Sequence, residues 1–124
     1  MGRKILPRTL ARQIVEAAFG AKAEDIVVLD ISKIADFADY FVIASGTSRR
    51  HIQTIADKII EDQEGRKRHY IGLEGYEYGE WVLVDYGSVI VHIFHPQKRE
   101  FYALERLWGD ARRVVFRNVF GKTS

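Results

Sequence analysis

The sequence predicts a single α/β domain with a mixed five-stranded sheet flanked by helices. The chain has 124 residues, the size of one ordinary domain, and is 47% apolar and 29% charged, which is typical of a globular protein. Short apolar runs of strand length alternate with longer segments in which apolar residues recur every three or four positions. Some neighbouring strands are separated by a helix and others by a tight turn, so the sheet should contain parallel and antiparallel pairs.

A helix and two strands are expected in the first third of the chain. The helix is predicted over residues 9–19, with Thr9 as its N-cap and Gly20 as its stop. The apolar residues on its face are Leu10, Ile14, Ala17 and Ala18. Residues 26–29 and 40–44 are short runs rich in β-branched and aromatic residues, which predicts two buried strands.

A second helix should follow a short polar loop, capped by Ser48 and ending at Gly65. Its apolar face consists of Ile52, Ile55, Ala56, Ile59 and Ile60. Free backbone N–H groups and the helix dipole favour an anion at such a start, although two arginines reaching into solvent need no ligand. The members of this candidate anion-binding loop are Gly46, Thr47, Ser48, Arg49 and Arg50.

The second half of the chain predicts three strands and a last helix. The strands lie near residues 70–73, 81–85 and 89–94, and the turn at 86–88 should join the last two in a hairpin. Residues 89–94 are apolar on both faces except at one histidine, which indicates a central strand. Pro96 should begin the helix. Its apolar stripe, before the interruption at Gly109, consists of Phe101, Leu104, Leu107 and Trp108.

Charge is distributed unevenly along the chain. The segments 1–15 and 111–124 each hold four basic residues and no acidic one. The remaining 11 basic residues share positions 16–110 with all 17 acidic residues, so the middle of the chain carries a net charge of −6. An acidic body suits a basic protein surface, whereas basic ends suit phosphates or simply keep a small protein soluble.

Composition also excludes several classes of protein. The absence of cysteine rules out a disulfide framework, a thiolate metal site and a cysteine nucleophile, and fits a cytoplasmic location. No apolar run approaches the ~18 residues of a membrane span, and the start of the chain does not form a signal-peptide core. His92 and His95, three apart on a strand, should point to opposite faces, and His51 and His69 stand alone, so no metal site is predicted.

No pattern of catalytic residues is found. A strand, a glycine-serine turn and a helix also describe nucleotidyltransferase-like enzymes, which need an Asp-x-Asp pair on a strand to hold two metal ions. The acidic residues that lack such a partner are Asp30, Asp57 and Asp85. Asp36 and Asp39 are typical of a solvated turn, and neither Ser45 nor Ser48 lies in a Gly-x-Ser-x-Gly elbow. The sequence therefore predicts no catalytic residue and no cofactor.

Aromatic residues near the hairpin suggest a binding surface instead. Trp81 and Tyr86 lie at the two ends of one strand, where burial is not obligatory, whereas Trp108 continues a helical stripe and fits the core. Large aromatic side chains at such places commonly anchor protein interfaces. Trp81 and Tyr86 are therefore the preferred candidates for partner contacts.

Several motifs together resemble the ribosomal silencing factor, or Iojap-like, family. They are DYFVIASGTSRRH at 39–51, EG at 74–75, WVLVDYG at 81–87, VH at 91–92 and REFY-x-LE-x-LW at 99–108. The match runs in order from about residue 9 to residue 110. It implies a nucleotidyltransferase-like fold without catalytic acids, binding to the fourteenth protein of the large ribosomal subunit, a steric block to joining of the small subunit, and homodimers.

The resemblance also implies a binding face. Carried over to this sequence, it consists of Trp81, Leu83, Asp85, Tyr86 and Gly87, supported by Arg99 and Tyr102. An acidic and aromatic patch of this kind suits a basic ribosomal protein. The alternative from the residues alone is a nucleotide-binding or nucleotidyltransferase-like enzyme that uses the loop Gly46-Thr47-Ser48.

The last residues are expected to be an appendage. The sequence divides into a silencing-factor domain at 1–110 and a basic extension at 111–124. We expect the extension to form a short amphipathic helix that packs on the body or contacts rRNA. Its apolar residues at helical spacing are Val115, Phe116, Val119 and Phe120.

Overall fold

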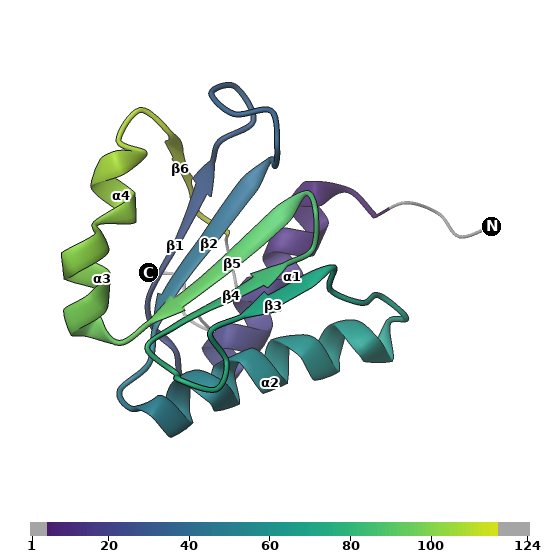
Figure 1. The fold of residues 1–124 in the computed structure, drawn as a ribbon. Coiled ribbons are helices and arrows are strands. Elements are labelled where there is room, and N and C mark those ends of the chain that lie inside the picture. Colours follow the sequence, from purple (N-terminus) through teal and green to yellow (C-terminus); the bar gives the residue numbers. More distant parts are fainter. Residues whose placement is uncertain (1–4, 117–124) are drawn as a thin grey trace.

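The structure is a computed structural model that describes residues 5–116, with the side chains of all of these except Glu100, Phe101, Tyr102 and Leu104. Helices and strands alternate as the sequence predicts for an α/β domain (Figure 1). In chain order they are α1 (Pro7–Gly20), β1 (Glu24–Asp30), β2 (Tyr40–Ser45), α2 (Arg49–Gly65), β3 (Gly72–Glu74), β4 (Trp81–Asp85), β5 (Val89–Phe94), α3 (Pro96–Tyr102), α4 (Leu104–Leu107) and β6 (Arg112–Val114).

The strands form one mixed sheet in the order β3-β4-β5-β2-β1-β6. β2 and β5 pair in parallel and the other neighbours pair antiparallel, so the prediction of a mixed sheet is confirmed. β4 and β5 form the predicted hairpin, and β5 and β2 lie at the centre. Central strands are covered on both faces, which explains why their sequences are nearly continuous apolar runs.

The sheet has six strands in the described part of the chain, so the prediction of five is wrong. The additional strand is β6, in which Val114 pairs with Val28 and Arg112 with Asp30 of β1. Two arginines in a three-residue edge strand leave no apolar run for sequence analysis to detect, because an edge strand has few buried positions.

β6 also changes the expectation for residues 111–124. Residues 112–114 form a strand instead of a helix, and Phe116 is buried beneath the guanidinium groups of Arg8 and Arg12 of α1. These contacts attach the chain beyond residue 110 to both the sheet and α1. Val119 and Phe120 lie outside the described residues.

Two helices cover one face of the sheet. Figure 1 shows α1 and α2 side by side behind and below the strands, whereas α3 and α4 lie beside β1 at the left of the view. The main core lies between the first two helices and the strands, where Ile14, Ile55, Ile59 and Val91 are completely buried. A smaller apolar cluster around Phe41 and Phe94 occupies the opposite face.

Three helix boundaries depend on backbone chemistry. Ser48 caps α2 as predicted, because its hydroxyl accepts a hydrogen bond from the N–H of His51. Thr9 does not cap α1; the helix begins at Pro7, whose fixed φ suits the first helical position. The predicted last helix is broken in two at Ala103, which has a left-handed φ of 49°.

Candidate protein-binding face

The face of the sheet opposite α1 and α2 is open along β4. Residues directly opposite each other in an antiparallel pair project to the same side of a sheet, and the pairs here join Trp81 to Phe94, Leu83 to His92 and Asp85 to Ile90. We call this surface the aromatic face; it consists of Trp81, Leu83, Asp85, Ile90, His92 and Phe94. Glu74 of β3 pairs with Leu83 and adds a second carboxylate beside it.

The described residues cover only part of this face. Trp108, which follows α4, packs edge-on against Phe41 of β2 with ring centroids 5.3 Å apart. Phe41 and Phe94 are buried, whereas Trp81, Leu83 and Ile90 are partly exposed. Partly exposed apolar side chains on a flat strand surface are typical of a protein contact site.

Trp81 is held in a defined orientation. Its indole Nε1–H donates a hydrogen bond to Nδ1 of His92 at 3.1 Å, and its ring stacks on Phe94 with centroids 5.0 Å apart. A side chain that is already ordered loses little conformational entropy when a partner binds. Trp81 is therefore suited to act as a preorganised anchor.

His92 is the polar residue beneath this anchor. Burial lowers the pKa of His92 to about 4, so the imidazole is neutral near pH 7. Because Nδ1 accepts the Trp81 hydrogen bond, the hydrogen of the neutral ring is on Nε2, and this atom has no hydrogen-bond partner among the described residues. The imidazole ring packs edge-to-face with the ring of Phe41, with centroids 4.8 Å apart.

Asp85 and Gly87 shape the end of the face. A carboxylate oxygen of Asp85 accepts a hydrogen bond from the N–H of Gly87 at 2.7 Å, which fixes the turn between β4 and β5. Gly87 has a φ of +88°, a conformation that favours glycine. Asp85 thus contributes negative charge to the face and also holds the hairpin turn in place.

Tyr86 is not part of the aromatic face, so the structure separates it from Trp81. Side chains alternate between the two faces of a sheet along a strand. Tyr86 is therefore on the same face as Val82 and Val84, which are buried against the helices. It packs against the main core, where burial raises the pKa of its phenol to about 12. The two aromatic residues that the sequence grouped together therefore face opposite sides.

Arg99 acts within the protein. Its guanidinium forms two hydrogen bonds with the Glu105 carboxylate, each 3.0 Å long, and a third with the Ser45 hydroxyl at 2.8 Å. These contacts join α3, α4 and the end of β2, and they lower the pKa of Glu105. Arg99 thus positions the helices that flank the face, and the side chain of Tyr102 lies outside those described.

The candidate anion-binding loop uses its own hydrogen-bond donors internally. The N–H of Gly46 donates to Phe94 and that of Thr47 to Nδ1 of His51. A Cβ at Gly46 would lie 2.7 Å from Ile52, so close packing against α2 explains this glycine. The Arg49 guanidinium donates a hydrogen bond to the carbonyl oxygen of Glu77, so this side chain is held against the loop before β4.

Two further observations limit the chemistry of the described residues. Between residues 5 and 116, no group of three or more His, Cys, Asp or Glu side chains is arranged to hold a metal ion. Within the same range, none of the helices combines the length and hydropathy that a membrane span requires.

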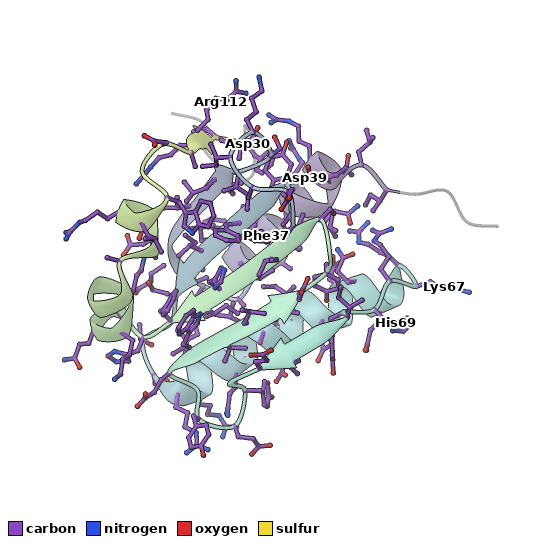
Figure 2. All side chains as sticks on the ribbon, turned by 45° about the horizontal axis from the view of Figure 1, so that its top comes forward. Asp30, Phe37, Asp39, Lys67, His69 and Arg112 are labelled. Atoms are coloured by element: carbon purple, nitrogen blue, oxygen red, sulfur yellow. The ribbon has the colours of Figure 1, made fainter. Side chains whose placement is uncertain are left out.

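Phe37 is a surface residue that the sequence analysis missed. It lies in the loop between β1 and β2 (Figure 2) and is 56% exposed. Its ring contacts those of Phe41 and Trp108. These contacts extend the apolar surface across β2. An apolar residue between Asp36 and Ala38 in a polar loop was the available signal.

Fold and surface together define a small α/β domain with an open, acidic and aromatic sheet face. The family model described as "Ribosomal silencing factor during starvation" matches residues 5–123. The protein belongs to this family, as its motifs indicate.

Curated relatives agree with this assignment. The chain is 40% identical over 110 residues to the ribosomal silencing factor RsfS of Halalkalibacterium halodurans, covering 89% of this chain and 94% of the relative. It is 44% identical to RsfS of Bacillus subtilis, covering 73% and 76% of the two chains. A mouse relative named "Mitochondrial assembly of ribosomal large subunit protein 1" is 38% identical over 69% of this chain and 39% of its own length.

Solved structures show the same fold. A crystal structure of protein CV0518 from Chromobacterium violaceum superposes with a TM-score of 0.83 at 33% identity, covering 90% of this chain and 92% of that one. A second, from Bacillus halodurans, has a TM-score of 0.79 at 36% identity, covering 88% and 99%. The likeness spans almost the whole described structure.

Proposed function

We propose that this protein represses translation by binding the large ribosomal subunit through its fourteenth protein and sterically blocking association with the small subunit. The names of its relatives support action on the ribosome, including the mouse protein named for assembly of the large subunit. The name "ribosomal silencing factor" denotes a regulator. Because most of the relatives reported above are bacterial, the proposed place of action is the cytoplasm.

The observation that carries this proposal is the aromatic face, whose apolar residues on β4 are partly exposed. Trp81 is oriented by His92 and Phe94, and Leu83 lies next to it on the same side of β4. An ordered aromatic residue surrounded by apolar neighbours matches the centre of a protein interface, which typically buries about 800 Å² on each partner.

Charge supports a basic partner. Asp85 and the exposed Glu74 border the apolar centre, so the approach of Lys or Arg side chains is favourable. Ribosomal proteins are generally basic because they contact RNA. A steric mechanism requires only that this surface be occupied at the subunit interface, and no chemical step is needed.

The experiment is co-sedimentation of the purified protein with isolated large and small ribosomal subunits. We expect binding to the large subunit alone and fewer joined ribosomes when both subunits are mixed. Trp81→Ala should weaken binding about 30-fold, the effect of losing about 2 kcal/mol at an interface anchor. Leu83→Lys, which breaks no hydrogen bond in the protein, should weaken it through charge repulsion.

The matched control is Tyr78→Ala, because Tyr78 is 82% exposed but belongs to the loop between β3 and β4. It should bind like the wild type, and circular dichroism should show that every variant is folded. Failure of the wild type to bind the large subunit would overturn the proposal. So would binding by Trp81→Ala and Leu83→Lys at wild-type strength. Contacts of the basic ends with rRNA and formation of a homodimer stay predictions.

A further inference from the structure

A groove of about 620 Å³ lies on the other side of β4 from the aromatic face. It is bounded by the start of α1, the segment after α2 and the turn between β4 and β5. Ile5, Pro7 and Leu10 are its apolar lining residues, and Tyr86 also lines it. A volume of this size and a mainly apolar lining are typical of sites for small organic ligands.

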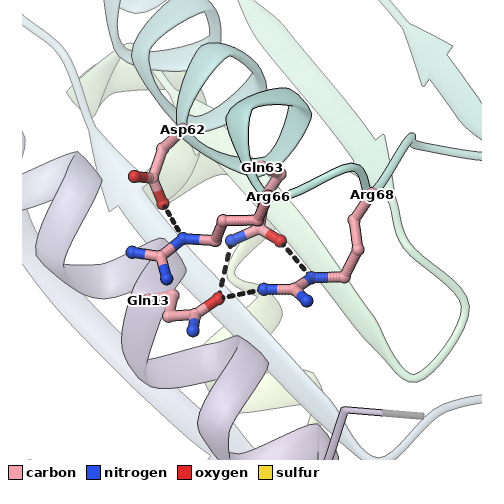
Figure 3. Close-up of polar contacts among 5 residues, drawn as sticks. All are labelled: Gln13, Asp62, Gln63, Arg66 and Arg68. Atoms are coloured by element: carbon pink, nitrogen blue, oxygen red, sulfur yellow. Dashed lines mark hydrogen bonds and ion pairs between the residues drawn. The ribbon is translucent and has the colours of Figure 1, made fainter. Parts of the chain in front are cut away.

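Arg68 lines this groove and is held rigidly. Figure 3 shows its guanidinium between two glutamines: Nε donates to Oε1 of Gln63 at 2.7 Å, and Nη2 donates to Oε1 of Gln13 at 2.6 Å. Gln63 is completely buried and also donates to Gln13 at 3.1 Å. This network joins α1, α2 and the following segment, so the position of the charge is fixed by the fold.

The charge of Arg68 is not neutralised by a direct ion pair. Both of its hydrogen-bond acceptors are uncharged amides, and among residues 5–116 no carboxylate lies within 4.0 Å of its guanidinium. The nearby carboxylate of Asp62 is paired with Arg66 at 3.1 Å, as Figure 3 also shows. A fixed and partly buried guanidinium without a counterion is favourable for binding an anion.

Tyr86, another lining residue, carries an unsatisfied polar atom. The hydroxyl of Tyr86 is buried and forms no hydrogen bond with the described residues. Burial, together with the charges of Glu64 and Asp62, raises the pKa of this phenol, and the charge of Arg68 opposes that increase. The groove thus combines apolar walls with an unpaired cation and an unpaired hydroxyl.

The acidic and basic sides of the groove are separate. Asp39 and His69 both line it, and Figure 2 shows them well apart, Asp39 near the start of β2 and His69 beyond the end of α2. On the side of Arg68, the nearest described carboxylates are already engaged, Glu64 with the imidazole of His69 at 4.0 Å and Asp62 with Arg66 at 3.1 Å. Repulsion by Asp39 therefore acts mainly on the far end of a ligand whose acidic group contacts Arg68.

We propose that this groove binds a small organic anion, with its acidic group on Arg68 and its apolar body between Leu10 and the ring of Tyr86. The proposal does not depend on ribosome binding, because the groove and the aromatic face lie on opposite sides of β4. The ligand class is defined by this chemistry: one carboxylate, sulfonate or phosphate group attached to an apolar body.

The test uses two probes that differ only in charge. 8-Anilinonaphthalene-1-sulfonate carries a sulfonate on an apolar body, and N-phenyl-1-naphthylamine is the same body without it. Each is titrated into the ¹⁵N-labelled full chain while the backbone amide resonances are followed by NMR. We expect the sulfonate to shift the amides of Leu10, His69 and Ser88 saturably and to bind at least about tenfold more tightly than the neutral probe.

Two arginine variants provide the matched comparison. Arg68→Met should abolish the preference for the sulfonate, whereas Arg66→Met, at an arginine already paired with Asp62, should retain it. Because the first variant also removes the two hydrogen bonds that Arg68 donates to Gln13 and Gln63, circular dichroism checks that it is folded. If it unfolds, the comparison of the two probes in the wild type still tests the proposal. Equal affinity for both probes in the wild type would overturn the proposal. Shifts confined to Leu83 and Ile90 would also overturn it, because the probe would then occupy the aromatic face.

Discussion

Acidification from pH 7.5 to pH 4.5 should destabilise the protein through His92. Burial lowers the pKa of this residue from 6.5 to about 4 in the folded state, whereas the unfolded chain keeps the ordinary value. Between about pH 6.5 and pH 4, His92 is therefore protonated in the unfolded chain but neutral in the folded protein. The free energy of unfolding is highest above pH 6.5 and decreases as the pH falls through this range. A difference of this size corresponds to about 3 kcal/mol in full, most of it lost by pH 4.5.

The assay is urea unfolding, followed by circular dichroism, of the wild type and His92→Gln at several pH values between 4.5 and 7.5. Glutamine has no charge to gain, and its amide can still accept the hydrogen bond from Trp81. Carboxylates such as Glu105, whose pKa is lowered by Arg99, also make the stability depend on pH. Their effect is the same in the wild type and in His92→Gln, so it cancels when the two pH dependences are subtracted. The variant should lose about 2 to 3 kcal/mol less stability on acidification than the wild type.

A second histidine variant controls for the substitution itself. His69→Gln replaces a side chain that is 73% exposed, and it shows how much any histidine replacement alters the curve. Parallel pH dependence in the wild type and His92→Gln would refute the reasoning, because it would mean that His92 accepts a proton as readily in the folded state as in the unfolded chain.

Three other predictions concern single positions. Ala103→Gly should raise the free energy of unfolding by about 1 kcal/mol, because Ala103 has a left-handed φ of 49°; a lower urea midpoint would contradict this. Gly75→Ala should lower the free energy of unfolding by about 3 kcal/mol, because Gly75 has a φ of +76° and a Cβ there would lie 2.0 Å from the carbonyl oxygen of Trp81. Gly20→Ala is the control, since a Cβ at Gly20 would lie in open space and should not destabilise the protein. When tyrosine ionisation is followed by ultraviolet absorbance, the wild type should show one phenol that Tyr86→Phe lacks, and this phenol should ionise near pH 12 instead of pH 10.

Much of the fold could be predicted from the sequence because local chemistry specifies it. The central strands are apolar on both faces, and the hairpin has a glycine in its turn, which adopts a φ of +88°. Ser48 acts on a backbone N–H three residues away, so its role as a cap is also visible in the sequence. Such interactions span a few residues, and a periodic pattern is sufficient to detect them.

The candidate site was predicted only in part. Trp81, Leu83 and Asp85 share a face because side chains alternate along β4, which the sequence implies once the strand is recognised. The same alternation removes Tyr86 from that face, and Arg99 is occupied by Glu105 and Ser45. Resemblance to a family names residues of a motif but does not say which of them support the surface and which form it.

Local periodicity and contiguous motifs were sufficient to predict the fold class, the order of the main elements and the family. Features that depend on long-range contacts could be found only in the folded structure. Two arginines become a sixth strand only because the edge of β1 is available to them. Arg68 becomes a fixed, unpaired cation only because Gln13, 55 residues away, meets it across the core. Such contacts join segments that are far apart in the chain, and neither segment contains a local pattern that identifies its partner.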